Sequence, residues 1–244
     1  MKTLVLIPSR LSATRLPGKP LLKINGLSII SHVFKAAQKA NIGEVYVATE
    51  DQEIANDVKK NGGEAILTSN THKTGTDRIY EAIKKLGKKD VELVMNLQGD
   101  EPLMNTDDIK NLNKQMIKFK CNFGTLASKI ADEKILENEN IVKVMTEEIL
   151  NESNFPLALR FKRRLDKNDS RIYHHLGIYC YKLKTLENFV SMSQSQNEIE
   201  YRLEQLRALD NNVKINVALA KSSPIGVDTK DDFLAIKKIM EYKS

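Results

Sequence analysis

The sequence has few of the residues that build disulfide frameworks or membrane spans. It contains two cysteines, Cys121 and Cys180, and they do not form a CxxC pair. A disulfide framework or a zinc site is therefore not expected, and a reducing, cytoplasmic compartment fits better. No run approaches 18 apolar residues, so no segment is expected to cross a membrane. The short apolar run that ends at Pro8 is also too short for a secretion signal.

Aromatic residues are scarce as well, at 6% of 244 residues. The formal net charge is +6, and such an excess favours nucleic acid, anionic lipid or a small polyanionic substrate. A nucleic-acid-binding module requires basic residues interleaved with aromatics on one surface. The scarcity of aromatics and the scattering of basic residues among acidic ones leave that class as a remote alternative. We expect neither a nucleic-acid partner nor a membrane partner.

The remaining composition is that of an ordinary globular protein, with 41% hydrophobic and 29% charged residues. The length suits one large α/β domain, and a single domain over residues 1–244 is predicted. The first half alternates predicted strands with predicted helices, which indicates a parallel sheet covered on both faces. The strands are Thr3–Ile7, Glu44–Ala48, Glu64–Leu67 and Val91–Leu97, and the helices are Ser28–Ala40, Gln52–Asn61 and Thr76–Leu86.

The second half is less regular, and antiparallel strands added to the parallel sheet are expected there. The predicted strands are Ile141–Met145, Leu157–Phe161, Tyr173–Tyr181 and Lys214–Ala218. The polar stretch Lys162–Ser170 is expected to be an exposed loop. Helices are predicted over Glu198–Leu209 and Lys230–Glu241.

A basic, glycine-containing loop, Ser9–Pro20, follows the first predicted strand. Ligands bind at the carboxyl ends of the strands in a doubly wound sheet, so this loop is well placed for a site. Arg10, Arg15 and Lys19 would suit a triphosphate, and Gly18 would let the backbone approach the phosphates. The loop matches neither the Walker A pattern nor GxGxxG, which argues against P-loop and dehydrogenase functions. A solvated basic loop remains the alternative.

Two acidic segments are candidates for a magnesium site. Asp100 and Glu101 follow the strand Val91–Leu97, and a carboxylate at a strand end suits Mg²⁺. Asp100 is the preferred ligand, because Glu101 precedes a proline and is expected to point away. Asp228 precedes the last predicted helix and would supply a second ligand. The alternatives are a simple turn and a helix cap, in which Thr229 and Asp232 form a capping box.

Seven segments together resemble the 3-deoxy-manno-octulosonate cytidylyltransferase family, also called CMP-Kdo synthetase. The resemblance runs from Thr3 to about Glu241. The segments are IPSRLSATRLPGKPL, TGTDRI, NLQGDEP, NENIVKV, HHLGIYCY, EYRLEQLRALDNN and GVDT. It implies a Rossmann-like nucleotidyltransferase fold, with a mixed, mostly parallel sheet and a small antiparallel extension through which members form homodimers. It also implies transfer of CMP from CTP to Kdo, with release of pyrophosphate, for lipopolysaccharide synthesis in a Gram-negative bacterium.

The resemblance also implies a role for individual residues. Arg10, Lys19 and Asp100 would be catalytic, and Asp100 with Asp228 would hold Mg²⁺. The expected CTP-binding residues are Arg10, Arg15, Lys19, Thr74, Gly75, Thr76 and Asp100. The expected sugar-binding residues are Arg78, Gln98, Lys143, His175, Tyr179, Glu204 and Gln205. By themselves, His175 would be a structural histidine, and Glu204 and Gln205 a solvated helix face.

The chain departs from the family pattern between Asn151 and Arg164. The Ser-Arg pair that is usual in the family is missing there, and Arg160 or Arg163 is a candidate replacement. The use of CTP is therefore better supported than the exact sugar. An 8-amino derivative of Kdo and a sialic-acid-type sugar remain alternatives at this point.

Overall fold

The computed structural model describes residues 1–12, 15–130, 134–164 and 170–242. The chain divides into two compact units. Met1–Ile109 and Pro224–Ser244 form the first unit, and Lys110–Ser223 forms the second unit. The single domain expected for residues 1–244 stays a prediction. None of the helices in the described part is long and apolar enough to cross a membrane.

Parallel strands form the centre of the first unit. They are β1 (Thr3–Ser9), β4 (Gly43–Thr49), β5 (Ala65–Leu67) and β6 (Leu93–Asn96), in the order β6-β1-β4-β5. The side chains of residues 4–7 are all buried, as the continuous apolar run in the sequence predicts for a strand covered on both faces. A short 3-10 helix, η1 (Lys19–Leu21), and a small hairpin of β2 (Lys23–Ile24) and β3 (Leu27–Ser28) follow β1.

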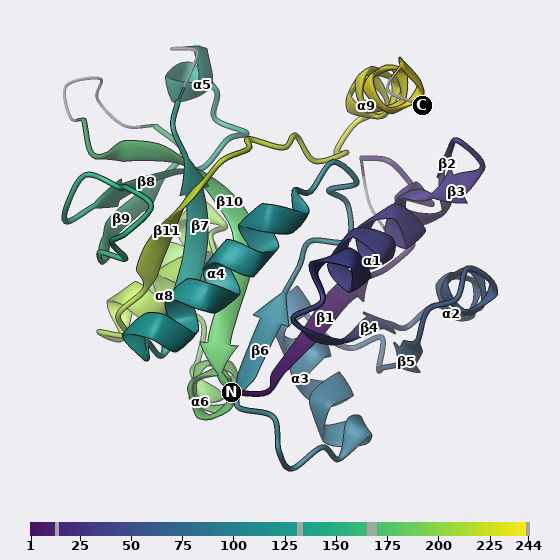
Figure 1. Ribbon diagram of the computed structural model, residues 1–244, viewed down its shortest axis with the longest axis horizontal. Helices are drawn as coiled ribbons and strands as arrows, with labels where there is room; N and C mark the ends of the chain where they lie inside the picture. The colour runs from purple at the N-terminus through teal and green to yellow at the C-terminus, as the bar shows by residue number, and fades with distance from the viewer. Residues whose placement is uncertain (13–14, 131–133, 165–169, 243–244) are drawn as a thin grey trace. The chain divides into compact units, whose positions relative to one another are not determined.

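Helices cover both faces of these strands. The helices α1 (Ile29–Ala40) and α2 (Gln52–Lys60) contact each other, while α3 (Gly75–Leu86) packs on β1 and β4 from the other face (Figure 1). The chain passes outward from β1 to β4 and β5, and then returns through α3 to β6 on the other side of β1. The carboxyl ends of β1 and β6 therefore flank a topological switch point, where open α/β sheets bind ligands. The last helix, α9 (Lys230–Tyr242), also belongs to this unit.

The ends of the helices follow local sequence signals. Ser28 caps α1 by accepting a hydrogen bond from the amide of Ser31 at 3.2 Å, and Thr74 caps α3 by accepting one from Asp77 at 3.1 Å. Gly87 ends α3 with a φ of 62°, a left-handed conformation that favours glycine. These caps fix where the loops around α3 begin and end.

The second unit is built on strands of mixed direction. They are β7 (Phe123–Ser128), β8 (Lys143–Thr146), β9 (Ala158–Lys162), β10 (Ile172–Lys182) and β11 (Asn216–Ala220). The strand β10 pairs antiparallel with β7 and β8, β8 pairs antiparallel with β9, and β11 runs parallel to β7. The antiparallel strands predicted for the second half of the chain are thus confirmed.

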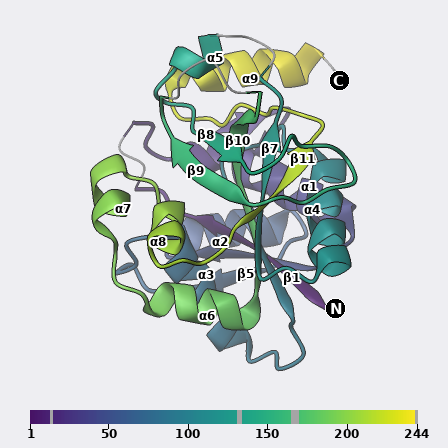
Figure 2. The same cartoon turned by 90° about the vertical axis from the view of Figure 1, so that its left-hand side faces the viewer.

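Helices of the second unit include α5 (Lys134–Glu137), α6 (Leu183–Ser191), α7 (Gln196–Tyr201) and α8 (Gln205–Asp210), and α4 (Thr106–Phe119) continues into it from the first unit. The helices α7 and α8 lie side by side (Figure 2). The loop predicted over Lys162–Ser170 begins at the last residue of β9, and its residues 165–169 lie outside the described part of the chain.

The single helix predicted over Glu198–Leu209 is wrong. The chain forms α7 and α8 instead, and Arg202 between them has a φ of 53°. A buried ion pair accounts for the break, because Arg207 donates to both carboxylate oxygens of Glu198, at 2.6 and 2.8 Å. In one straight helix these residues, nine positions apart, would be separated by about 13 Å along the axis.

Candidate functional site

A pocket of about 400 Å³ lies in the first unit, at the switch point between β1 and β6. The loop after β1 and the turn after β6 supply most of its lining, together with the segment that leads into α3 and the residue Asp228. The lining residues are Pro8, Ser9, Arg10, Arg15, Leu16, Lys19, Pro20, His72, Lys73, Thr74, Gly75, Arg78, Gln98, Gly99, Asp100 and Asp228.

The basic loop after β1 is held closed by its own backbone. The amide of Gly18 donates to the carbonyl of Leu11 at 3.2 Å, and the φ of Gly18 is 71°. The amide of Leu11 in turn donates to Oδ2 of Asp51 at 2.7 Å. Asp51 precedes α2, so its carboxylate ties the loop to the rest of the unit. Residues 13–14 of this loop lie outside the described part of the chain.

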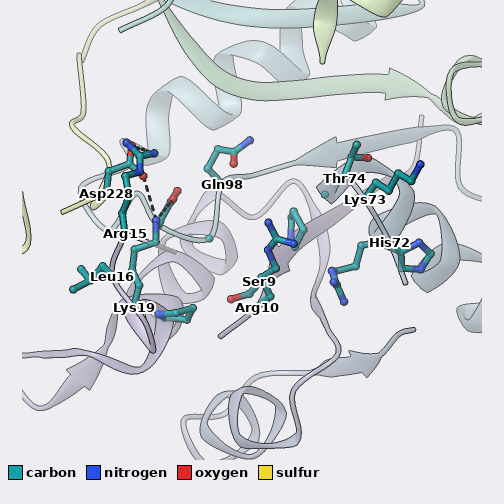
Figure 3. Close-up of a pocket in the computed structure, with 16 residues that line it drawn as sticks. Ser9, Arg10, Arg15, Leu16, Lys19, His72, Lys73, Thr74, Gln98 and Asp228 are labelled. Atoms are coloured by element: carbon teal, nitrogen blue, oxygen red, sulfur yellow. Dashed lines mark hydrogen bonds and ion pairs between the residues drawn. The ribbon is translucent and has the colours of Figure 1, made fainter. Parts of the chain in front are cut away.

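Lys19 joins the two acidic segments that the sequence analysis singled out. Its Nζ lies 2.6 Å from Oδ2 of Asp100 and 3.5 Å from Oδ1 of Asp228 (Figure 3). Arg15 pairs with the other oxygen of Asp228 at 3.1 Å. The side chain of Lys19 is only 12% exposed, so its charge interacts with these carboxylates in a partly dehydrated setting. Two acids and two cations therefore converge at one end of the pocket.

Backbone contacts fix this arrangement. The amide of Val227 donates to the carbonyl of Asp100 at 2.9 Å, which brings Asp228 next to the turn after β6. Gly99 lies so close to β1 that a Cβ atom would stand 2.8 Å from the carbonyl oxygen of Pro8, so glycine is required there.

The segment that carries Asp228 is also secured by the start of α9. Thr229 and Asp232 exchange reciprocal bonds, as the predicted capping box requires. The carboxylate of Asp232 accepts from the amide of Thr229 at 2.8 Å, and the amide of Asp232 donates back to Oγ1 of Thr229 at 3.2 Å.

A small hydrophobic cluster supports both sides of the acidic end. Its buried members are Ile24, Ile29, Val227 and Ile236, and Leu16, Leu22, Leu103, Phe233 and Met240 pack against them. Leu16 belongs to the basic loop and Val227 immediately precedes Asp228. Burial of this cluster, which includes residues of α9, therefore holds the cationic and the acidic segments in place together.

Glu101 does not line the pocket, although it follows Asp100 directly. Its Oε2 is buried and has no hydrogen-bond partner in the described part of the chain. Burial, followed by the charges of Asp100 and Asp228, raises the pKa of Glu101 to about 8. Glu101 is therefore mostly uncharged at neutral pH, and the negative charge of this end comes from the two aspartates.

The opposite wall is formed by His72, Lys73 and Thr74, which precede the first turn of α3 (Figure 3). The hydroxyl of Thr74 is engaged at the helix start, where it donates to Oδ2 of Asp77 at 2.9 Å. A Cβ atom on Gly75 would stand 3.1 Å from Cγ of Pro8, so the wall lies close to the end of β1.

Arg78, on the first turns of α3, reaches the pocket with a guanidinium that already has several partners. It pairs with Glu50, donates to Oγ1 of Thr68 at 2.8 Å, and donates to the carbonyl of Ser69 at 3.3 Å. Its side chain is 4% exposed. These contacts fix its position firmly, and its assignment to the sugar stays a prediction.

Most of the predicted nucleotide and metal residues are thus brought into one pocket. Thr76 is buried and does not line it. The other predicted sugar residues, Lys143, His175, Tyr179, Glu204 and Gln205, belong to the second unit.

Lys143 is fully buried in the second unit. Its ammonium donates to the carbonyls of Asn138 at 2.7 Å, Ile141 at 2.9 Å and Arg163 at 2.5 Å. Burial, together with the charges of Arg163 and Arg164, lowers the pKa of Lys143. All three ammonium hydrogens therefore have backbone acceptors, and a role in sugar binding stays a prediction.

The remaining second-unit residues are also largely buried. His175 interacts with Oγ1 of Thr125 at 3.0 Å, and its ring packs against Phe161 and Tyr179. Burial and the neighbouring His174 lower the pKa of His175 to about 3, so the ring is neutral near pH 7. Gln205 is buried at the start of α8, next to Glu204.

The two candidate replacements for the missing Ser-Arg pair differ in their contacts. Arg163 donates to the carbonyls of Glu139 and Tyr201, at 3.0 and 3.4 Å, whereas Arg160 lies exposed on β9.

Sequence reasoning missed several lining residues, among them Ser9, His72, Lys73 and Gly99. Their position along the chain offered a signal, because each lies next to a residue that was singled out. Ser9 adjoins Arg10, Gly99 adjoins Asp100, and His72 with Lys73 immediately precedes Thr74.

A match to a family model defines the chain as a cytidylyltransferase. Residues 4–215 match the family model described as cytidylyltransferase. That match covers most of the chain and includes all but one of the residues that line the pocket.

Named relatives specify the family further. The chain is 41% identical to the 3-deoxy-manno-octulosonate cytidylyltransferase of Nitrobacter hamburgensis, over 98% of this chain and 93% of that protein. It is 38% identical to the enzyme of the same name from Bartonella tribocorum, over 98% and 99%. The chain therefore belongs to the 3-deoxy-manno-octulosonate cytidylyltransferase family.

Solved structures agree with this assignment. A CMP:2-keto-3-deoxy-manno-octonic acid synthetase in complex with CTP matches with a TM-score of 0.90 and 32% identity, over 100% of both chains. A cytidylyltransferase from Leptospira borgpetersenii matches with a TM-score of 0.66 and 18% identity, over 99% of this chain and 87% of that one, which supports the fold alone.

Proposed function

We propose that this chain transfers CMP from CTP to 3-deoxy-D-manno-octulosonate, forming CMP-Kdo and pyrophosphate. In this reaction the anomeric hydroxyl oxygen of the sugar bonds to the α-phosphorus of CTP. The bond from that phosphorus to the bridging oxygen of pyrophosphate breaks, and the hydroxyl proton is lost. The observation that carries the proposal is the convergence of Lys19, Arg15, Asp100 and Asp228 in a pocket of a cytidylyltransferase fold.

The cations of the basic loop would bind the triphosphate. Arg10, Arg15 and Lys19 all line the pocket, and their fixed positive charges suit the phosphate oxygens. Negative charge builds up on the departing pyrophosphate, and cations that are already in place stabilise it without reorganising. Lys19 and Arg10 therefore have the catalytic role in this proposal.

The two aspartates suit a magnesium ion. Both carboxylates already reach a single cationic atom, Nζ of Lys19. Mg²⁺ is held by one or two carboxylates together with water and substrate phosphate, so a third protein carboxylate is not required. Bound there, the metal would supply Lewis-acid polarisation of the phosphate oxygens. Asp100 and Asp228 would hold it, and Glu101, which does not line the pocket, would not.

The wall at the start of α3 would bind the nucleoside through Thr74 and Gly75, with Thr76 buried beside them. Arg78 and Gln98 would bind the sugar. The second-unit contacts that the family resemblance implies at His175, Tyr179, Glu204 and Gln205 stay predictions. Lys143, whose ammonium donates to three backbone carbonyls, would have a structural role. A homodimer and a cytoplasmic location are part of the same proposal. Cys121 and Cys180 are free thiols, which is consistent with a reducing compartment.

The test of the function is a product assay. The protein is incubated with CTP, Mg²⁺ and, separately, Kdo, 8-amino-Kdo and sialate, and the products are identified by mass. We expect CMP-Kdo and an equivalent of pyrophosphate. Turnover of sialate alone, or of none of the three sugars, would contradict the proposal.

Asp100→Ala tests the metal site. We expect turnover to fall by about a thousandfold or more, because removal of one electrostatic group at a transition state typically costs a hundredfold to a thousandfold and the metal site would be lost as well. The measurements are kcat across a Mg²⁺ titration and Mn²⁺ affinity by electron paramagnetic resonance. Circular dichroism and thermal unfolding check the fold. Near-normal turnover at saturating Mg²⁺ would remove Asp100 from the site.

A further inference from the structure

One carboxylate anchors the pocket wall that contains His72. Glu81, on α3, accepts hydrogen bonds from the amide of Ser69 at 3.2 and 3.0 Å, and from Nζ of Lys85 at 2.8 Å. It also bonds to Nε2 of His72. The segment that forms the wall is therefore fixed to the helix behind it at two separate points.

This contact determines which ring nitrogen of His72 carries hydrogen. Burial opposes ionisation of Glu81, but hydrogen bonds from Lys85, His72 and Ser69 outweigh it and lower the pKa of that carboxyl to about 2. An ionised carboxylate can only accept hydrogen bonds, so Nε2 of His72 must donate. In the neutral imidazole, the other nitrogen, Nδ1, is then an acceptor. Within the described residues Nδ1 has no hydrogen-bond partner.

The position of His72 relates this acceptor to the base of a bound nucleotide. Arg15, Lys19 and Asp228 lie at one end of the pocket, and His72 lies on the opposite wall, beside Lys73 and Thr74 (Figure 3). A nucleoside triphosphate whose phosphates bind the cations would extend its base toward the wall of His72. The side chain of His72 lines the pocket and is 18% exposed.

An acceptor at this position distinguishes the two pyrimidines. Cytosine carries an exocyclic amine, which donates, where uracil carries a carbonyl oxygen, which accepts. A fixed lone pair would bind the amine and repel the carbonyl. A pocket discriminates strongly between two ligands when one ligand hydrogen-bonds to a buried polar group and the other leaves that group unpaired.

We propose that His72 is a specificity-determining residue that accepts a hydrogen bond from the exocyclic amine of cytosine through Nδ1, and that Glu81 is the positioning residue that fixes this tautomer. The inference rests on the proposed use of CTP. Selection of cytosine over uracil would then depend partly on two side chains, His72 just before α3 and Glu81 within it.

Two isosteric variants test which nitrogen acts. His72→Asn places an amide oxygen near the position of Nδ1, and His72→Gln places it near the position of Nε2. The measurement is the ratio of kcat/KM for CTP to that for UTP, with Kdo and saturating Mg²⁺. We expect His72→Gln to lower the ratio by about tenfold, the value of one hydrogen bond together with one unpaired group. His72→Asn should keep it within about threefold of wild type, by the same arithmetic.

The role of Glu81 is tested with a matched control. Glu81→Gln can present either a donor or an acceptor to His72, so the tautomer is no longer fixed and the CTP:UTP ratio should fall. Lys85→Met removes a different partner of Glu81 and leaves the bond from His72 in place. The side chain of Lys85 is 51% exposed, so its replacement should disturb the fold little. It should keep the wild-type ratio. Thermal unfolding of each variant checks that the pocket still forms.

Several outcomes would overturn the inference. An unchanged CTP:UTP ratio in both His72 variants would do so, as would an equal loss on both nucleotides, since the wall would then have only a structural role. Loss of the preference in both variants would overturn the assignment to Nδ1. If His72→Gln does not fold, Glu81→Gln and His72→Asn decide in its place. Failure of the wild type to use CTP is a separate result, and it refutes the proposed function itself.

Discussion

Lys19 in the first unit and Lys143 in the second unit are both shielded from solvent, but their ammonium groups face different partners. Lys19 contacts the side-chain carboxylates of Asp100 and Asp228, in an open pocket. Lys143 donates to three backbone carbonyls. Carboxylates at the end of side chains can exchange one cation for another. Backbone carbonyls that belong to the folded chain cannot be given up without loosening the structure around them.

The difference separates a lysine that is available for chemistry from one that holds a structure together. Both lysines follow from the family resemblance as substrate contacts, and residue type alone does not distinguish them. The partners of a buried charge, rather than its burial, therefore indicate its use. Variants at the two positions should therefore fail in different assays.

Among the variants that test this contrast, the largest effect is expected for Lys19→Met. Loss of the ammonium removes a charge that would stabilise the leaving pyrophosphate, so kcat/KM for CTP should fall by about a hundredfold to a thousandfold. The free energy of unfolding should change little, because the carboxylates that lose their partner, Asp100 and Asp228, are 32% and 46% exposed and stay hydrated. Steady-state kinetics and urea unfolding measure the two quantities. If the variant lost enough stability to explain its lost activity, Lys19 would have a structural role like that of Lys143, and the prediction would be wrong.

Sequence reasoning worked best where local patterns determine structure. The apolar run of β1 and the capping residues Ser28 and Thr74 determine where β1, α1 and α3 begin. The predicted starts of these three elements lie close to the observed ones. The strand β7 has no predicted counterpart. All six of its residues are buried, but Gly124, Thr125 and Ser128 interrupt the apolar pattern that marks a strand.

The helix over Glu198–Leu209 was mispredicted for a different reason. The spacing of Leu203, Leu206 and Leu209 continues a helical pattern, while the break at Arg202 accompanies a tertiary ion pair that no local pattern encodes. The site shows the same limit. Its three cations, Arg10, Arg15 and Lys19, lie in one loop and are predicted from the sequence. Lys19, however, lies 81 residues from Asp100 and 209 from Asp228, so only the fold reveals the contact between them.

Lys143→Met should show the opposite behaviour from Lys19→Met. Three carbonyls would lose their donor, and we expect the free energy of unfolding to fall by about 2–3 kcal/mol, less than the sum of three bonds because a buried charge is also removed. At a temperature where the variant is folded, KM for Kdo and for CTP should stay near wild type. Denaturant titration and kinetics provide the measurements.

A Lys143→Met variant that raised KM for Kdo tenfold or more and kept wild-type stability would contradict the structural role. Lys143 would then be a sugar contact, as the family resemblance implies. Lys162→Met, at an exposed position on the neighbouring strand β9, is a matched control and should alter neither quantity.

The smallest effect concerns acid stability and His175. Its folded pKa of about 3 lies below that of an unfolded histidine, so the unfolded chain binds more protons as the pH falls below about 6.5. Between pH 7 and pH 5 this should cost about 2 kcal/mol of unfolding free energy. His175→Asn does not titrate, so its stability should decline less over the same range. Urea titrations at both pH values give the two slopes, and identical slopes would refute the assignment.

The capping box at the start of α9 has a consequence for the dynamics of the last helix. Thr229 and Asp232 secure the first turn of α9 directly beside Asp228, and Val227 and Ile236 pack in one cluster behind it. Fraying of α9 would therefore displace one of the two pocket acids. By linkage, whatever binds Asp228 in the native state must oppose that fraying, so amide hydrogen exchange in α9 should slow when the pocket is filled. The C-terminal helix thus reports occupancy of a site that it does not itself line.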